Sequence, residues 1–508
     1  MKKIRILALI LCLLLLVPAL IACGDTEKET GTTAAAAQST TPEETGPDKD
    51  HDEIPAGTNY NGEQINLILR TYSERYSSEF LVTEETGDAL KDEIYRRQLR
   101  VQSRLGIQLN LVEDTYSTSN RAHGPWNAID SKIASGDAEF DIVAGSNYNA
   151  QVNVIKGTYH NLLNIEEFHF DKNYYPQEVI SNMKIGNAMF TLTGDISTYL
   201  WDSLYVVFFN RQLCENYQLS STMIYDLVRK GEWTIDKMFE LTKDIYVDTN
   251  SNSKKDDGDT FGLAVLITSA TDGLFSSCNI PIIGEVDGQL DVVTDLDKLS
   301  NVVDKFITNV WGTNGVVPIS ELTSNASDTV PYYEKQFGNG EYGFLTQILY
   351  MLNTDAFRNM KDDYGILPYP KYDKDQATYN TYVHDQFTAL AIPMTVTEDR
   401  LAMVANVLEA MSSDGREKVK PVYYGIALTG KYAKDTGSIE MLDKIFANIT
   451  MDRGWIFGNP LKGFAQSILR TPIMNNQNNL ASTYQTKVDQ TKTKLADIVA
   501  AFDLYAEN

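Results

Sequence analysis

Oxygen-bearing side chains recur at regular spacing in the segment DTNSNSKKDDGD, residues 248–259. They fall at positions 1, 3, 5, 9 and 12 of an EF-hand-like loop, which supplies oxygen ligands to calcium. The candidate calcium ligands are Asp248, Asn250, Asn252, Lys254, Asp256 and Asp259. The loop departs from the pattern at Ser253, where the EF-hand has glycine, and at Asp259, which is shorter than the usual glutamate. The segment is therefore either a structural calcium site or a solvated acidic turn, and no other cofactor is expected.

No catalytic centre is visible in the motifs of this chain. Its five histidines lack metal-ligand spacing, and the sequence has no G-x-S-x-G or C-x-x-C motif. A glycosidase pair among the 69 Asp and Glu residues is not recognisable from spacing, because such a pair is defined by its separation in space. We therefore expect a protein that is not an enzyme, with a surface-anchored glycoside hydrolase as the alternative.

Aromatic and polar side chains favour carbohydrate binding instead. The chain has 28 tyrosines against 19 phenylalanines, and aromatic faces suit the C–H surfaces of sugar rings while polar side chains bond to hydroxyls. Such groups gather in the loops 70–76 and 145–149. The candidate contacts in these loops are Tyr72, Glu74, Arg75, Ser146, Asn147 and Tyr148. Trp201, with the nearby Asp195, is a further candidate, although tryptophan at any one position more often fills a core.

Both loops follow predicted strands. Apolar residues alternate with polar ones over 64–69 and 107–111, and a further strand is predicted at 140–144. Helical periodicity over 88–105, and a second helix that ends near Gly136, separate these strands. The alternation predicts an α/β sheet, in which ligands bind outside the carboxyl ends of the strands.

The rest of the body continues with mixed elements. Residues 203–210 predict a strand that is buried on both faces, and Thr234 predicts the N-cap of a helix. From about residue 399 to the end, the pattern is largely that of amphipathic helices.

The N-terminal segment predicts export. Residues 1–22 have a basic start and an apolar run, as in a signal peptide, and Leu20-Ile21-Ala22-Cys23 resembles the lipobox of bacterial lipoproteins. We expect Cys23 to be lipidated and residues 23–58, which are poor in apolar side chains, to form a flexible linker. The two remaining cysteines of the body, Cys214 and Cys278, either pair or stay as buried thiols.

Charge and hydropathy exclude two classes of protein. The formal net charge of −25 argues against nucleic acid as a partner, because a polyanion requires a surplus of cations. No second apolar run resembles the N-terminal one, which excludes a polytopic membrane protein. The expected location is the extracytoplasmic face of the cell membrane, with contact to the membrane through the lipid alone.

The body, from about residue 60 to residue 508, resembles the extracellular solute-binding proteins of ABC importers, of the sugar-binding family 1 type. The order and spacing of several segments carry this resemblance, and no single one is diagnostic. Besides the lipobox they are Ile133–Val143, Leu204–Leu213, Gly231–Thr234, Asn339–Phe344, Tyr364–Pro370 and Phe387–Pro393.

The resemblance implies a two-lobed, periplasmic-binding-protein-like α/β fold of type II, with hinge crossovers and a helical C-terminal part. Mapped onto this chain, one lobe comprises residues 59–205 and 341–386, and the other comprises residues 206–340 and 387–508. Hinges are expected near 204–210, 340 and 388. Closure around a ligand that touches both lobes would be a hinge motion.

The resemblance also implies a function. A monomer that binds a carbohydrate, expected to be an oligosaccharide, would deliver it to the transmembrane permease subunits of an ABC transporter. Trp455 joins the candidate contacts because the family often presents an aromatic side chain in this region, and His384 joins them because it precedes a presumed crossing. A peptide-binding or adhesin-like lipoprotein is a further alternative.

Overall fold

The computed structural model describes residues 48–113, 124–136, 139–319, 322, 329–429 and 436–508. The predicted signal peptide, the lipidation site Cys23 and the linker up to residue 47 lie outside the described residues. From Lys49 to Asn508 the chain forms one compact unit.

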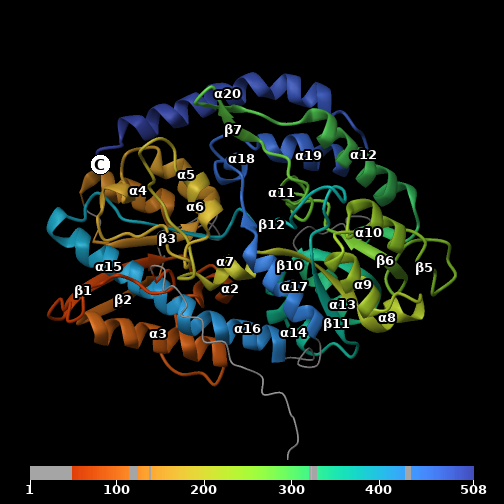
Figure 1. The fold of residues 1–508 in the computed structure, drawn as a ribbon, viewed down its shortest axis with the longest axis horizontal. Coiled ribbons are helices and arrows are strands. Elements are labelled where there is room, and N and C mark those ends of the chain that lie inside the picture. Colours follow the sequence, from red (N-terminus) through yellow and green to blue (C-terminus); the bar gives the residue numbers. More distant parts are fainter. Residues whose placement is uncertain (1–47, 114–123, 137–138, 320–321, 323–328, 430–435) are drawn as a thin grey trace, which may run out of the picture. The chain divides into compact units, whose positions relative to one another are not determined.

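A four-stranded sheet is built mostly from the first part of the chain, and its strand order is β13-β3-β1-β2. Strands β1 (Glu63–Leu69), β2 (Ile107–Glu113) and β3 (Ile142–Ser146) are parallel, whereas β13 (Thr388–Ala391) pairs antiparallel with β3 (Figure 1). The three parallel strands correspond to those predicted at 64–69, 107–111 and 140–144.

A six-stranded sheet contains the strands β11-β4-β10-β6-β5, and β9 pairs with β6. Its members are β4 (Tyr205–Asn210), β5 (Tyr246–Val247), β6 (Thr260–Val265), β9 (Val316–Pro318), β10 (Tyr342–Ile348) and β11 (Tyr364–Pro368). Every residue of β4 and β10 is buried, as expected for central strands covered on both faces. Two small sheets are formed by β7 (Ile283–Val286) with β8 (Gln289–Val292), and by β12 (Thr381–Tyr382) with β14 (Ile449–Thr450).

The strand pairing differs from the predicted division of the chain. Residues 341–386 were expected beside 59–205, but β10 and β11 pair with β4 in the six-stranded sheet. The segment after 387 was expected in the other lobe, yet β13 returns to the four-stranded sheet. The residues of a buried strand do not predict which sheet it joins, because this depends on the strand with which it pairs.

The chain passes from one sheet to the other between β3 and β4, and back between β11 and β13. Two of the expected hinge positions, near 204–210 and near 388, lie at these passages. The expected hinge near 340 instead lies beside β10, within the part that forms the six-stranded sheet. An isolated bridge between Leu204 and Val383 joins the two passages.

Local sequence signals determine where several helices begin and end. Asp88 caps α3 (Ala89–Leu105) by accepting the N–H groups of Leu90 and Lys91, and Gly106 ends it in the left-handed conformation with φ 61°. Thr234 caps α10 (Ile235–Thr242), as predicted.

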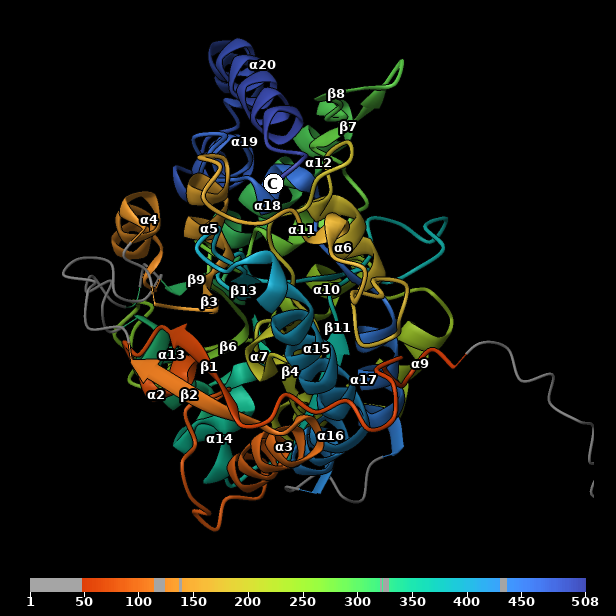
Figure 2. The same ribbon diagram turned by 90° about the vertical axis from the view of Figure 1, so that its left-hand side faces the viewer.

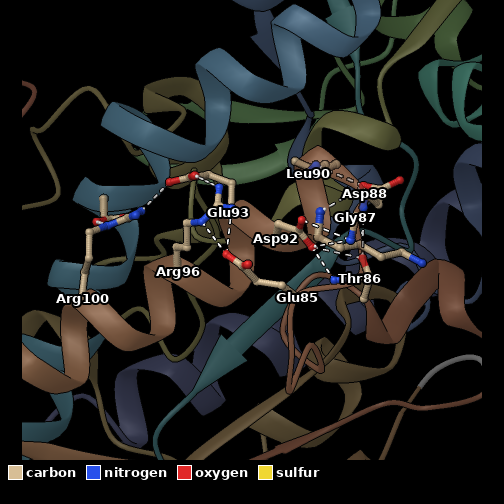
Figure 3. A network of polar contacts seen from close by, with 11 residues as sticks. Glu85, Thr86, Gly87, Asp88, Leu90, Asp92, Glu93, Arg96 and Arg100 are labelled. Atoms are coloured by element: carbon tan, nitrogen blue, oxygen red, sulfur yellow. Dashed lines mark hydrogen bonds and ion pairs between the residues drawn. The ribbon is translucent and has the colours of Figure 1, made fainter. Parts of the chain in front are cut away.

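Ion pairs fix the first turns of α3 (Figure 3). Arg96 pairs with Glu85 and Glu93, and Arg100 reaches Glu93 and Asp414. The Asp92 carboxylate accepts backbone N–H groups of the preceding turn.

The other helices of the first two thirds of the chain are mostly short. They are α2 (Glu74–Ser77), α4 (Trp126–Ser135), α5 (Asn147–Val154), η2 (Leu162–Asn164), α6 (Gln177–Met183), α7 (Thr198–Asp202), α8 (Arg211–Asn216), α9 (Ser221–Arg229), α11 (Gly273–Ser277), α12 (Leu296–Gly312), α13 (Thr329–Gly338), η4 (Leu349–Asn353) and α14 (Asp355–Arg358).

The C-terminal part is helical, as expected. It consists of α15 (Glu398–Asp414), the π-helical η5 (Gly415–Val419), α16 (Lys420–Thr429), α17 (Thr436–Ala447), α18 (Arg453–Ile456), α19 (Phe464–Met474) and α20 (Leu480–Leu504). The helices α15 and α16 pack along α3 (Figure 2), whereas α17 packs against β11. No helix among the described residues is both long and apolar enough to cross a membrane.

The end of the predicted flexible linker is docked on the body. Asp52 forms two hydrogen bonds with Arg104, at 2.6 and 2.7 Å. Glu53 pairs with Lys172 at 2.8 Å, and Asp50 pairs with Arg416. The expectation of flexibility was therefore wrong for residues 48–58, because their acidic side chains find cations from distant parts of the chain.

Cys214 and Cys278 are both buried and unpaired, which resolves the alternative left open by the sequence. Burial raises the pKa of the Cys278 thiol to about 12. Both cysteines are thus packing residues with little thiolate character.

We predict that Gly262→Ala destabilises the six-stranded sheet. A Cβ atom on Gly262 would lie 2.0 Å from the carbonyl oxygen of Thr242, a distance that the backbone must relieve by moving. We expect a loss of about 1–3 kcal/mol in the free energy of unfolding, measured by urea denaturation.

The matched control is Gly425→Ala in α16. No atom lies within 4 Å of the added methyl group there, so the substitution should raise stability by about 0.5–1 kcal/mol. Equal effects of the two substitutions would contradict the packing argument.

Candidate functional site

A cavity of about 80 Å³ lies where the carboxyl ends of strands from both sheets meet. It is lined from the first sheet's side by Arg75, Tyr76 and Tyr199, and from the second sheet's side by Leu266, Ser269, Gln347, Ile348 and Met351. His384 and Gln386, from the return passage between the sheets, complete the lining. Leu266 follows β6, and Ile348 ends β10, so this is the edge where α/β proteins bind ligands.

A second cavity of about 180 Å³ shares Arg75 with the first. Its lining combines the start of α3 with the end of α7, η4 and α14, through Asp88, Lys91, Asp202, Tyr350 and Arg358 among others. The two cavities therefore form one candidate site that draws residues from both sheets, and Arg75 lies between its halves.

Tyrosine rings hold two arginines at this site. The guanidinium carbon of Arg70 lies 4.3 Å from the ring centre of Tyr76 and 4.9 Å from that of Tyr199. The same carbon of Arg75 lies 4.2 Å from the ring centre of Tyr350 and 5.4 Å from that of Tyr199. Such contacts attract a cation to the negative face of an aromatic ring.

Arg70 is held in place by a buried polar network. Its Nη2 donates to the Gln386 carbonyl and to the Thr388 hydroxyl, both at 2.9 Å. The Glu79 carboxylate accepts hydrogen bonds from the Thr388 and Ser197 hydroxyls. Burial raises the pKa of Glu79, and the charge of Arg70 opposes this shift. The network fastens the end of β1 to the passage that carries His384.

An aromatic cluster adjoins the cavity at His384. The ring of Tyr205 stacks on Tyr382 with centres 5.5 Å apart and on His384 with centres 5.8 Å apart. Trp455 lies 5.4 Å from Tyr382 and is also buried. Among the described residues, the Trp455 Nε1 and the Tyr382 hydroxyl are buried without a hydrogen-bond partner. Buried donors of this kind are groups that a polar ligand can satisfy.

Two carboxylates lie beside this cluster, Asp272 buried and Asp385 with 12% of its side chain exposed. Asp272 forms hydrogen bonds with Arg470, and the charge of Arg470 also acts on Asp385. Burial raises the pKa of Asp272 to about 7 and that of Asp385 to about 6. Asp385 also lies next to Tyr148, whose N–H donates to the Asp385 carbonyl at 3.0 Å. Carboxylates at this position can accept hydrogen bonds from hydroxyl groups of a ligand.

The structure brings several of the predicted contacts together. Arg75 and His384 line the smaller cavity, and Glu74 lines the larger one with Arg75. Trp455 belongs to the aromatic cluster. Ser146, Asn147 and Tyr148 lie at the end of β3, where the Asn147 amide donates to the Ile456 carbonyl at 3.1 Å. None of the described cavities is lined by Tyr72, whose side chain is 60% exposed.

Asp195 and Trp201 form a structural pair instead of part of the site. The Trp201 Nε1 donates to Asp195 at 2.9 Å, and Lys420 pairs with the same carboxylate at 2.9 Å. Both Asp195 and Trp201 are buried, and neither lines a described cavity. Indole and carboxylate satisfy each other, so neither is left to bind a ligand.

Sequence reasoning missed most of the lining, because only Glu74, Arg75 and His384 of the residues that line the two cavities had been named. Tyr76 and Gln386 are immediate neighbours of predicted contacts, and extending the candidate loops by one or two residues would have included them. Tyr199, Gln347 and Tyr350 reach the site through the arrangement of strands and turns. No signal in the chain marks them.

The acidic loop 248–259 closes on itself. The Asp248 carboxylate accepts the N–H groups of Asn252 and Ser253, and the Asp259 carboxylate accepts those of Thr249 and Asp256. Nowhere in the described part of the chain do three His, Cys, Asp or Glu side chains converge as a metal site requires. Calcium at this loop therefore stays a prediction. A calorimetric titration of the chelator-treated protein with calcium tests it.

The largest of the described cavities, of about 920 Å³, lies elsewhere, between α20 and the β7–β8 hairpin. Charged side chains are prominent in its lining, including Lys184, Glu285, Arg453, Lys492 and Asp503, beside apolar residues of α20 and of the hairpin. No aromatic ring lines this cavity, so it lacks the aromatic surface expected of a carbohydrate site.

Comparison with known proteins identifies the fold. No protein-family model matches the sequence, and no curated protein matches it. The chain resembles a solved structure of an ABC-transporter-associated binding protein from B. animalis subsp. lactis in complex with β-1,6-galactobiose. The TM-score is 0.54 at 13% identity, over 85% of this chain and 98% of the other.

Two further solved structures are similar at 11% identity and a TM-score of 0.53. One is the galacto-N-biose and lacto-N-biose I binding protein of an ABC transporter from Bifidobacterium longum, over 88% of this chain and 98% of the other. The other is an ABC substrate-binding protein from Listeria monocytogenes in complex with cycloalternan, over 86% of this chain and 99% of the other. The chain therefore has the two-lobed α/β fold of periplasmic-binding-protein-like solute-binding proteins.

Asp202 gives the site a pH dependence that can be measured. It is buried, and its Oδ1 accepts hydrogen bonds from the Tyr423 hydroxyl at 2.9 Å and from the Asn353 amide at 3.0 Å. Burial raises its pKa from 3.8 to about 7, against the effect of the Tyr423 hydrogen bond. A carboxyl group whose pKa is raised by folding stabilises the folded state at low pH, and this contribution is lost as the pH rises from about 4 to 7.

We predict that Asp202→Asn flattens the dependence of stability on pH. Between pH 5 and pH 8 the free energy of unfolding of the unsubstituted protein should fall more than that of the variant. The expected difference is on the order of 2 kcal/mol, since one pKa unit corresponds to about 1.4 kcal/mol. Urea denaturation at several pH values measures it. The exposed Asp287→Asn is the control and should follow the unsubstituted protein, whereas parallel profiles for Asp202→Asn would refute the prediction.

Proposed function

We propose that this protein is an extracellular receptor that binds a carbohydrate, an oligosaccharide in particular, between its two lobes. The observation that carries the proposal is the site at the meeting of both sheets, where aromatic rings, buried carboxylates and arginines converge. Sugar rings present apolar C–H faces together with polar edges, and this site offers both kinds of surface. The described proteins of similar fold were solved with saccharides, which supports the same ligand class.

We further propose that the receptor acts as a monomer and passes its ligand to the permease subunits of an ABC transporter. In this proposal, acylation of Cys23 tethers the protein to the extracytoplasmic face of the membrane. The order of signal, cysteine and acidic linker in the sequence supports it. Mass spectrometry of the mature N-terminus tests the anchor independently of ligand binding.

A glycoside hydrolase is the alternative that the site suggests, because such enzymes use a pair of carboxylates and both Asp272 and Asp385 lie near Arg470. Asp272, however, is bonded to Arg470, as expected of a carboxylate with a structural or binding role. Incubation of the protein with bound oligosaccharide should give no shortened product by chromatography. Turnover that Asp385→Asn abolishes would favour the hydrolase.

We predict that a panel of oligosaccharides contains ligands that raise the melting temperature, whereas peptides do not. At a ligand concentration about 100 times the dissociation constant, binding should add about 2.7 kcal/mol to stability. The identity of a small molecule retained through purification, read by mass spectrometry, would direct the panel.

Substitution of His384 should weaken binding of the saccharide found in this way. His384→Ala removes a ring that stacks on Tyr205 and lines the cavity. We expect the affinity to fall by roughly tenfold, or about 1.4 kcal/mol, in calorimetric titration. His51→Ala is the control, since the His51 side chain is 55% exposed and lines neither cavity of the site. Unchanged affinity in His384→Ala would place the ligand elsewhere.

A further inference from the structure

Two arginines lie against the same tyrosine rings but differ in their other partners. Arg70 donates hydrogen bonds to Gln386 and Thr388. Arg75 forms no hydrogen bond and no ion pair with any described residue, and its Nε is buried without a partner. The donors of an exposed arginine form hydrogen bonds with water. A buried donor without a partner costs free energy unless a ligand accepts its hydrogen bond.

The acids that line the larger cavity are engaged with other groups, whereas Glu334, outside the lining, interacts with Arg75 through charge. In the larger cavity Glu74 pairs with Lys91, and Asp88 accepts the N–H groups at the start of α3. Asp202 accepts hydrogen bonds from Tyr423 and Asn353. Each acid that lines the cavity therefore has a donor that is not Arg75.

A second guanidinium, Arg358, lines the same cavity and forms no ion pair with any described residue. It is exposed, in contrast to Arg75. The lining of the cavity thus contains two guanidinium groups, and none of its acids forms a hydrogen bond or an ion pair with either of them among the described residues.

Stacking leaves the edge of the Arg75 guanidinium for a ligand. The Tyr350 ring covers one face of the group at 4.2 Å, and all of its N–H donors lie in its plane. A planar fork of N–H donors matches two oxygens of an anionic group, and such charge-assisted bonds are stronger than bonds to neutral hydroxyls.

We propose that the carbohydrate bound at this site carries an anionic oxygen group, which Arg75 receives. Such a group is the carboxylate of a uronic acid or a sulfate ester. This inference rests on the proposed function and specifies its substrate class. The net charge of −25 opposes an anionic ligand, because the field of such a chain repels anions, so binding of an acidic saccharide would depend on the local cation at Arg75.

The experiment compares acidic saccharides with neutral ones of similar size. The probes are trigalacturonate against galactotriose, and 3′-sulfolactose against lactose, with inorganic sulfate alone as a further arm. Calorimetric titration of the full mature chain should give at least a tenfold preference for one acidic probe over its neutral counterpart. The arm that binds distinguishes carboxylate from sulfate ester.

Variants at Arg75 assign the preference to this residue. Arg75→Gln should weaken binding of the acidic probe by about 10- to 100-fold, as expected for loss of a charge-assisted hydrogen bond, and should change binding of a neutral saccharide less than threefold. Arg75→Lys keeps the charge without the fork and should lie between these values. Arg229→Gln, a surface arginine paired with Asp226 and Glu440, is the matched control and should bind as the unsubstituted protein does.

The outcomes separate this inference from the proposed function. Binding of galactotriose or lactose as tight as that of the acidic probe would overturn the inference and leave the receptor for carbohydrate intact. Equal weakening of acidic and neutral ligands by Arg75→Gln would show a structural role only, which also overturns it. Binding of inorganic sulfate as tight as that of 3′-sulfolactose would show that the site recognises the anion without the sugar, which overturns the inference. Failure of every saccharide to bind would overturn both proposals.

Discussion

The buried guanidinium of Arg70 requires hydrogen-bond acceptors and an opposite charge, and the arrangement of the whole site depends on the residues that supply them. A charge removed from water is tolerated only when hydrogen bonds and an opposite charge replace the solvent. Arg70 follows β1 directly, and its partners are Gln386, Thr388 and Glu79. The end of the first strand is thereby joined to the passage between the sheets, and this joint places Arg75 on one side of the cavity and His384 on the other.

Tyrosines complete this joint without adding charge. Tyr76 and Tyr199 lie with ring centres 5.0 Å apart, edge to face, and each contacts both arginines. Rings can surround cations in a buried place because their faces carry partial negative charge and need no hydrogen-bond partner there. The site can therefore keep one guanidinium bonded and another available within the same aromatic frame.

Local sequence signals predicted the strands and helices of the first lobe. Contacts between residues far apart in the chain could not be predicted in this way. Apolar alternation, helical periodicity over 88–105 and the helix cap at Thr234 indicated elements that the structure contains, because these signals act over a few residues. The lobe assignment of 341–386 was wrong, because β10 could pair with either sheet as far as its own residues show. Residues 48–58 looked solvated for the same reason, since Arg104 and Lys172 are distant in the chain. Arg75 could be named because it adjoins a strand end, and His384 because it precedes a presumed crossing between the lobes, but Arg470 and Tyr350 required the fold.

The size of the site sets a condition on how a saccharide would enter. A cavity of about 80 Å³, or of about 180 Å³ beside it, is smaller than the roughly 300–1,000 Å³ of usual ligand sites. An oligosaccharide therefore needs the surfaces that carry Arg75 and Gln347 to separate. The contact between Arg75 and Tyr350 is available for this, because it is a stacking contact without hydrogen bonds and joins α2, beside the first sheet, to η4, which follows β10. The Arg70 network, in contrast, lies within the first sheet's side and would stay intact. Separation of Arg75 from Tyr350 would open the cavity, while the Arg70 network would keep the end of β1 in place.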